Sequence, residues 1–221
     1  MSSGRRVNIC FHGIGEPLRE MEPGESDYWV TEDFFREVVA YLSEQPGASV
    51  SFDDGNVSDY EIGLPVLRER GMRGSFFPVA GRINKPGSLE GGQLKALLDA
   101  GMTVGTHGMR HRPWTGLGDD ELIEELVTAR DLIAAEAGAR VSSAACPLGR
   151  YNRRVLTSLR KLGYAQVYTS DRATAPASAW LQPRFSVRSA DTLAGVRALF
   201  EKPTRLSGAK AHARIAAKRW R

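Results

Sequence analysis

Short apolar runs alternate along the chain with longer segments of helical periodicity. The apolar runs predict strands at 7–14, 49–55, 74–81, 103–108, 142–149, 166–171 and 182–188. The longer segments carry apolar residues three or four positions apart and predict helices at 31–45, 63–71, 90–101, 119–138 and 152–163. Strands that alternate with helices in this way favour a parallel sheet with helices outside it.

The residues at the ends of these segments fit the predicted boundaries. Thr31 precedes a helix, where its hydroxyl can cap free backbone amides. Gly71 and Gly101 each follow a helix, where a left-handed residue commonly ends the last turn. No glycine fingerprint of a dinucleotide-binding sheet accompanies the alternation, so we expect an α/β fold of the closed or nearly closed barrel type.

Composition adds the domain organisation. The chain has 221 residues, of which 42% are hydrophobic and 25% charged, as in an ordinary globular domain. We expect one barrel domain over 1–202 and a basic tail or helix over 203–221. Much of the net charge of +4 lies in that tail, and the near-neutral remainder does not indicate a nucleic-acid partner.

The chain shows no pattern of an exported or membrane-spanning protein. Arg5 and Arg6 precede a short apolar stretch that His12 interrupts, which does not fit a signal peptide. No window reaches the ~18 apolar residues of a membrane span. Cys10 and Cys146 fit reduced thiols better than a disulfide framework. We therefore expect a cytoplasmic protein.

Residues that can do chemistry gather at the predicted strand ends. His12 ends the first strand, Asp53 and Asp54 end the second, and His107 ends the fourth with His111 close behind. In barrels of parallel strands the reacting groups lie at the carboxyl ends of the strands. Three of the four histidines in the chain thus fall on one predicted face.

The spacing of His107 and His111 indicates a metal site. On a helical turn, residues four apart lie on one side, so both imidazoles can bind one ion. A carboxylate from the Asp53–Asp54 pair completes three ligands and leaves a position open for water. Zn²⁺ and other divalent transition metals accept this set. The second carboxylate can then take a proton from that water. A chance surface pair of histidines and a plain Asp-Gly turn are the alternatives.

Three stretches together resemble a known family. "SFDDG" (51–55), "THGMRH" (106–111) and "ACPLGRYNRRV" (145–155) are similar to three motifs of the NodB-homology domain of polysaccharide deacetylases, carbohydrate esterase family four. The resemblance extends from about residue 7 to 188. It implies a distorted (β/α) barrel with about seven parallel strands and removal of an N-acyl group, usually acetyl, from an amino sugar.

The resemblance also implies roles for single residues. Asp53 matches the catalytic base, and Asp54, His107 and His111 match the metal ligands. The backbone N–H of Leu148 matches a donor to the oxyanion that forms during amide hydrolysis. The expected cofactor is one divalent metal ion, Zn²⁺ before Co²⁺, Ni²⁺, Mn²⁺ or Fe²⁺.

The chain departs from the family pattern at two positions. The family's third motif often carries an arginine that orients the catalytic aspartate, and Ala145 stands there instead. We expect Arg184 to supply that charge from the seventh strand. The family's late histidine motif has no match, so we expect His12 to serve as general acid, with His212 in the tail as the competing candidate.

These observations predict a metal-dependent N-deacetylase. The expected substrate is an intracellular amino sugar, lipid-linked or part of a small-molecule glycoside, and the basic tail suggests peripheral contact with anionic lipid. A deformylase or other hydrolase of non-sugar amides or imides is an alternative on the same fold. A carbohydrate-binding relic without activity is another. The oligomeric state is not predicted.

Overall fold

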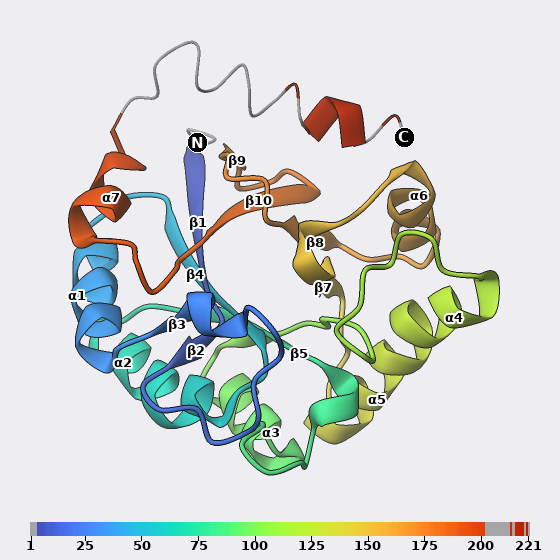
Figure 1. Cartoon of the computed structure of the whole chain (residues 1–221), viewed down its shortest axis with the longest axis horizontal. Helices are drawn as coiled ribbons and strands as arrows, with labels where there is room; N and C mark the ends of the chain where they lie inside the picture. The colour runs from blue at the N-terminus through green and yellow to red at the C-terminus, as the bar shows by residue number, and fades with distance from the viewer. Residues whose placement is uncertain (1–3, 202–212, 214, 219, 221) are drawn as a thin grey trace.

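The computed structural model describes residues 4–201, 213, 215–218 and 220. Its main sheet contains seven parallel strands (Figure 1). Their bounds are Arg5–Phe11 (β1), Ala48–Asp54 (β4), Gly74–Pro78 (β5), Thr103–Val104 (β6), Ser143–Ala145 (β7), Gln166–Thr169 (β8) and Leu181–Ser186 (β10). The order of the strands is β6, β5, β4, β1, β10, β8, β7.

The first and last strands of this order meet just beyond β6. The Thr106 amide donates to the Ser143 carbonyl at 3.0 Å, and the Ala145 amide donates to the Thr106 carbonyl at 2.9 Å. These bonds bring the two edges of the sheet together into a nearly closed barrel. The predicted single α/β domain with about seven parallel strands is confirmed.

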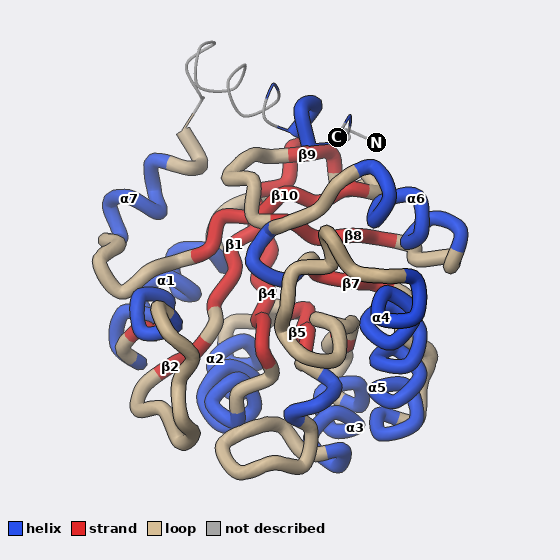
Figure 2. The backbone as a smooth tube through the Cα atoms, turned by 45° about the vertical axis from the view of Figure 1, so that its right-hand side comes forward, coloured by secondary structure: helices blue, strands red, loops and turns tan. Residues whose placement is uncertain are grey.

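Helices cover the outer side of most of the strands (Figure 2). Their bounds are Glu32–Ser43 (α1), Leu64–Glu69 (α2), Gly91–Asp99 (α3), Asp119–Ile123 (α4), Ala129–Ala137 (α5), Arg153–Lys161 (α6) and Leu193–Ala198 (α7). A π-helical turn, Glu124–Thr128, joins α4 to α5, so the predicted helix 119–138 is continuous but locally widened. Thr31 caps α1 through a bond from the Phe34 amide, as predicted.

The core lies between the sheet and the surrounding helices. Its centre is a group of phenylalanines, in which the rings of Phe52 and Phe76 stack with centroids 4.6 Å apart. A second buried cluster, which includes Trp114 and Leu126, packs under α4 and α6. Burial of these large rings stabilises the packing of helices against the sheet.

Two segments differ from the regular alternation that the sequence predicts. The connection from β8 to β10 holds no helix; it contains the short strand Ala175–Pro176 (β9), which pairs antiparallel with β1. Residues 15–28 form a long loop between the two-residue strands Gly13–Ile14 (β2) and Trp29–Val30 (β3) and end in the 3₁₀ turn Glu25–Tyr28. Among the residues described, no helix is long and apolar enough to cross a membrane.

Candidate active site

The Asp53–Asp54 pair ends β4 and is almost fully buried. The chain turns sharply there, because Asp54 and Gly55 both have φ of 74°. A Cβ atom on Gly55 would lie 2.7 Å from the Cβ of Pro78, so only glycine fits after the pair. The turn aims the two carboxylates in different directions.

Asp53 faces Arg184, which β10 holds in the barrel interior. Its two carboxylate oxygens accept bonds of 2.6 Å from the two terminal nitrogens of the fully buried guanidinium. Burial alone would raise the pKa of Asp53, but Arg184 and the nearby imidazoles hold it well below its usual range. Ala145, where the family often has arginine, is on β7, and the positive charge comes from β10 instead.

Asp54 faces the two histidines of "THGMRH". Its Oδ1 lies 3.8 Å from His107 Nε2 and 3.3 Å from His111 Nε2. That oxygen is buried and has no hydrogen-bond partner in the described part of the chain. One carboxylate oxygen and two imidazole nitrogens within 4.8 Å of one another fit a divalent transition metal.

The outer nitrogens of both imidazoles are fixed by acceptors. His107 Nδ1 lies 2.9 Å from the Ala145 carbonyl, and His111 Nδ1 lies 2.6 Å from a carboxylate oxygen of Glu22. Each Nδ1 therefore donates, and each Nε2 turns its lone pair toward Asp54. Burial lowers the pKa of His107 to about 4, despite the opposing effect of Asp53 and Asp54. A neutral imidazole is the form that binds metals.

The expected helical turn over residues 107–111 is wrong. This segment is a loop, in which Gly108 has φ of 84° and His111 has φ of 50°. The imidazoles still meet, with centroids 5.2 Å apart, because the buried carboxylate of Glu125 holds the loop. Glu125 accepts from the Met109 amide at 2.7 Å and from Arg112 Nε at 3.0 Å.

His12 approaches the same oxygen of Asp53 as His107, whose Nε2 lies 3.7 Å from it. His12 Nε2 is 3.9 Å from this oxygen, and its ring is 5.0 Å from that of Tyr28. Its Nδ1 is buried and, within the described residues, has no hydrogen-bond partner. The competing candidate for general acid, His212, lies outside the described residues.

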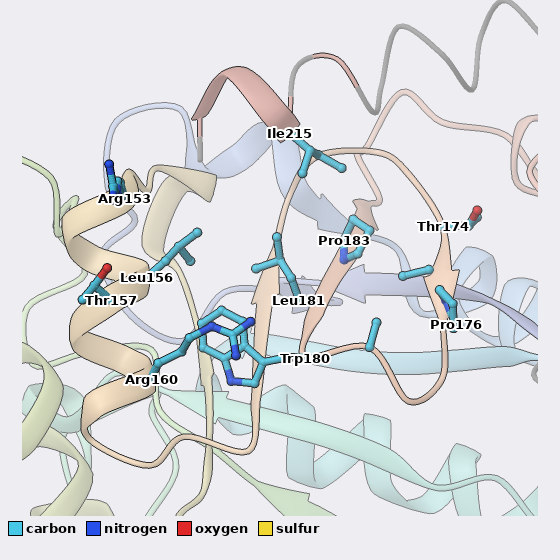
Figure 3. Close-up of a pocket in the computed structure, with 12 residues that line it drawn as sticks. Arg153, Leu156, Thr157, Arg160, Thr174, Pro176, Trp180, Leu181, Pro183 and Ile215 are labelled. Atoms are coloured by element: carbon cyan, nitrogen blue, oxygen red, sulfur yellow. The ribbon is translucent and has the colours of Figure 1, made fainter. Parts of the chain in front are cut away.

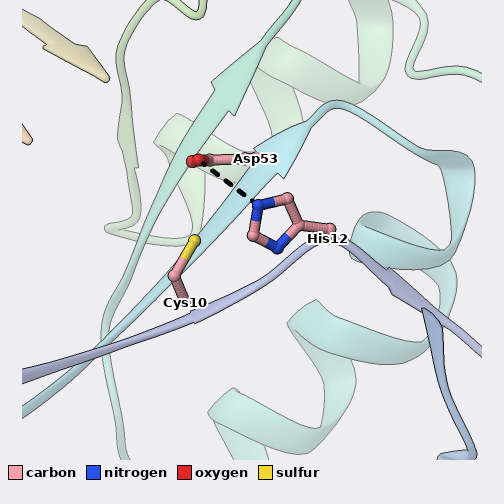
Figure 4. A group of neighbouring side chains, drawn as sticks. All are labelled: Cys10, His12 and Asp53. Carbon is pink, nitrogen blue, oxygen red and sulfur yellow. Dashed lines mark ion pairs between the residues drawn. The ribbon is translucent and has the colours of Figure 1, made fainter. Parts of the chain in front are cut away.

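Cys10, His12 and Asp53 form a second group with metal-ligating atoms (Figure 4). Two features argue against a metal ion there. Arg184 already occupies both oxygens of Asp53 and would repel a cation. Burial raises the pKa of the Cys10 thiol well above its usual value, which keeps the sulfur protonated. The Asp54–His107–His111 set is the better candidate metal centre.

Leu148 brings a backbone donor to the same site. It has φ of 54° inside the turn Pro147–Gly149 and is 58% exposed, unlike its neighbours. No acceptor among the described residues engages its N–H. Three non-glycine residues with positive φ, namely Asp54, His111 and Leu148, thus line one cavity. Such strained backbone concentrates at functional sites.

A cavity of about 230 Å³ joins these groups. The loop 15–28 forms one wall with Glu22 and Tyr28, and Leu148 stands in another. Six of the seven residues that the sequence singles out line this cavity, and the seventh, Arg184, lies beneath Asp53. The seven are His12, Asp53, Asp54, His107, His111, Leu148 and Arg184.

The sequence does not reveal Glu22 or Glu125 as members of the site. Glu22 belongs to a loop with no motif and reaches His111 across 89 residues. Glu125 sits in an ordinary amphipathic helix pattern, and its only signal is a carboxylate on the buried side of that helix. Both act on the histidines through contacts that no local spacing encodes.

The fold and the site together define a class: a parallel α/β barrel with a candidate metal centre and an acidic group beside it. The chain matches the sequence model of the polysaccharide deacetylase family over residues 43–167, more than half its length, and it belongs to that family. This confirms the resemblance to the NodB-homology domain. The family is described as that of polysaccharide deacetylases.

The chain is similar in sequence to one relative and in fold to several solved structures. YxkH of Bacillus subtilis, which is named as a polysaccharide deacetylase from its sequence, is 25% identical over 146 residues, which cover 66% of this chain and 52% of that protein. The chain therefore spans about half the length of this relative. The deacetylase PplD of Streptococcus pyogenes, solved with acetate, has a TM-score of 0.73 at 19% identity, covering 90% of this chain and 99% of its own. IcaB from Ammonifex degensii has a TM-score of 0.71 at 21% identity, and the match covers 89% of this chain and 97% of the IcaB chain.

Proposed function

We propose that this protein is a metal-dependent hydrolase that removes an N-acyl group, normally acetyl, from an amino sugar. The observation that carries the proposal is the unpartnered Asp54 oxygen facing two imidazole nitrogens, with Asp53 beside it. Membership of the deacetylase family supports the same chemistry.

Asp54, His107 and His111 would hold the metal ion. When bound, a divalent cation there polarises an acyl carbonyl and makes a water molecule more acidic. The neutral state of His107 and the lowered pKa of Asp54, which its neighbouring imidazoles cause against the effect of burial, both favour cation binding. We propose Zn²⁺ as the first candidate because it accepts two imidazoles and a carboxylate with an open position.

The remaining groups divide the proton transfers. Asp53 stays ionised because of Arg184, and each of its oxygens keeps a second lone pair with which to take the proton of the attacking water. The water oxygen bonds to the acyl carbon, and the Leu148 N–H donates to the oxygen that becomes negative. When the carbon–nitrogen bond breaks, His12 Nε2 donates a proton to the departing amine. The products are a carboxylate and a free amino sugar.

The cavity favours a small acceptor. Its volume of about 230 Å³ and the wall contributed by loop 15–28 enclose the reacting groups on one side. We propose an amino sugar at the end of a lipid-linked glycan or within a small-molecule glycoside. A sugar in the middle of a polymer needs a groove open at both ends.

The test is a substrate panel for the metal-loaded protein. N-acetyl and N-formyl amino sugars, both lipid-linked and small, are incubated with the enzyme, and released acetate and formate are measured. We expect acetate release from at least one amino sugar and none from the Asp53→Asn variant. Formate release alone would assign the site to deformylation, and no release from any member by a metal-loaded, folded protein would overturn the proposal.

A further inference from the structure

The barrel has a flank without a helix, on the outer side of β8 and β10. Because the connection between these strands contains β9 in place of a helix, a pocket of about 430 Å³ remains there beside α6 (Figure 3). Leu156, Trp180 and Leu181 give it an apolar lining. Ile215, from the C-terminal segment, contributes to the same lining. The described residues 215–218 of this segment are helical.

Lys218 extends from this segment to the rim of the candidate active site. Its Nζ donates to Asp171 Oδ1 at 2.7 Å and to the Gly149 carbonyl at 3.2 Å. The ammonium group also lies 5.1 Å from the centre of the Tyr151 ring. One side chain thus connects the docked segment to two residues of the loop 147–151.

Asp171 makes this connection strong, because its side chain is only 2% exposed. Its Oδ2 accepts 2.7 Å bonds from the hydroxyls of Tyr151 and Thr169, and its Oδ1 is left for Lys218. Among the described residues Lys218 is the cation that pairs with this carboxylate. A buried carboxylate whose cation is removed is destabilised and tends to change its protonation or its position.

The loop 147–151 is therefore held on both sides of Leu148. On one side the Cys146 amide donates to the Tyr168 carbonyl within the barrel. On the other, Lys218 fixes the Gly149 carbonyl and Asp171 fixes the Tyr151 hydroxyl. Leu148 and Gly149 both have positive φ, a conformation that a non-glycine residue keeps only when its surroundings enforce it.

We infer that Lys218 is a positioning residue for the reaction: through Gly149 and Asp171 it keeps the Leu148 N–H aimed into the cavity. This inference rests on the proposed function, in which that N–H donates to the developing oxyanion. The C-terminal segment then takes part in activity without touching the substrate.

The experiment compares Lys218→Met with Lys218→Arg and Trp220→Ala in the full-length protein. Methionine keeps the length of the side chain and removes its charge, whereas arginine can restore the ion pair with Asp171. Trp220 is 80% exposed on the same segment and serves as the control for general disturbance of the tail. For each variant, kcat, KM, Zn²⁺ affinity and hydrogen exchange of the 147–151 amides are measured.

For Lys218→Met we expect kcat to fall about tenfold or more, because a displaced donor loses its value in the transition state. KM and Zn²⁺ affinity should stay within about twofold, since neither depends on that donor. The Gly149 and Arg150 amides, which bond to the carbonyls of Cys146 and Pro147, should exchange faster. Lys218→Arg should recover most of kcat, and Trp220→Ala should match the wild type.

An unchanged kcat in Lys218→Met, or an equal loss in Trp220→Ala, would overturn the inference. Loss of Zn²⁺ affinity together with kcat would overturn it too, because the effect would then reach the metal ligands. If the wild type hydrolyses no amino sugar, the proposed function fails separately. Faster hydrogen exchange in Lys218→Met, confined to residues 147–151, would then still support the fixing of this loop by Lys218. Unchanged exchange would reject it.

Discussion

At the scale of single residues, two adjacent aspartates share His107 as a neighbour, at 3.7 and 3.8 Å, but have different main partners. Asp53 has both oxygens on Arg184, whereas Asp54 has a buried oxygen with no hydrogen bond and two imidazoles in front of it. The turn at Asp54 and Gly55 separates them. The sequence predicts that one aspartate binds a metal ion and the other accepts a proton, since two neighbouring carboxylates repel each other unless positive charge lies nearby. The residues alone leave open which aspartate binds the metal, and the family resemblance assigns that role to Asp54 and the contact with Arg184 to Asp53.

Replacing Asp53 by asparagine should separate metal binding from turnover. Asparagine keeps the shape but cannot take a proton, so we expect kcat to fall by at least about 100-fold. Zn²⁺ affinity should change little, because Asp53 lies outside the ligand set. The melting temperature should also fall, since Arg184 loses its buried counter-charge. Zn²⁺ titration and acetate release on the same folded sample check this. Full activity, or loss of Zn²⁺ binding, contradicts the assignment of Asp53.

His107 should make the metal-free protein sensitive to acid. The pKa of this residue is about 4 in the folded chain and 6.5 ordinarily, so between these values the unfolded chain binds more protons. The contribution of neutral His107 to the free energy of unfolding is therefore fully present above about pH 6.5 and is lost progressively as the pH falls toward 4. His107→Gln should show a flatter dependence over this window. Denaturant titrations of both metal-free proteins at several pH values measure it, and parallel curves would refute it.

At the scale of elements, one helix organises the loop that carries both histidines. The widened turn Glu124–Thr128 brings the fully buried Glu125 under residues 107–114, where it bonds to two backbone amides, an arginine and an indole. The sequence predicts the helix from its periodicity, and it predicts the histidine pair from its spacing. It gives the wrong local conformation for that pair, because a contact between distant segments replaces the helical hydrogen bonds.

Glu125→Gln should weaken the metal site from a distance. An amide cannot accept from all the donors that face this carboxylate, so the loop should loosen and Zn²⁺ affinity should fall about 10- to 100-fold. Glu124→Gln is the matched control, because its carboxylate pairs with the side chains of Arg110 and Arg112, whereas Glu125 also bonds to backbone amides of the loop. Calorimetric titration of both variants measures the difference. Equal affinities in the two variants would show that Glu125 has no such role.

At the scale of the whole molecule, strand order explains how the site is assembled. β4, β1 and β10 are neighbours in the barrel, so Asp53, His12 and Arg184 meet although up to 172 residues separate them. The sequence predicts this strand-end gathering, since parallel strands share one carboxyl edge. It could not predict the contact of Glu22 with His111 or that of Lys218 with Asp171. Loops and terminal segments lack the repeating apolar pattern from which packing can be predicted.

Arg184→Lys tests the departure from the family pattern at this scale. Lysine keeps the charge but makes one contact where the guanidinium makes a two-bond fork with Asp53. We expect kcat to drop at least about tenfold, with KM nearly unchanged, because Asp53 loses its fixed orientation. The melting temperature should also decrease. Steady-state kinetics and thermal unfolding measure both, and wild-type kinetics in this variant would rule out an orienting role.

Asp54, His107 and His111 are proposed to bind the metal ion on which deacetylation depends. The most direct test of this proposal is a Zn²⁺ titration of the metal-free wild type and of Asp54→Asn, with acetate release from an N-acetyl amino sugar followed in the same samples. Asparagine tolerates the positive φ at this position, so the fold should be preserved. We expect wild-type activity to rise to a plateau at one equivalent of Zn²⁺, and we expect Asp54→Asn neither to bind Zn²⁺ tightly nor to release acetate. Full activity without metal, or unchanged binding in the variant, would contradict this proposal.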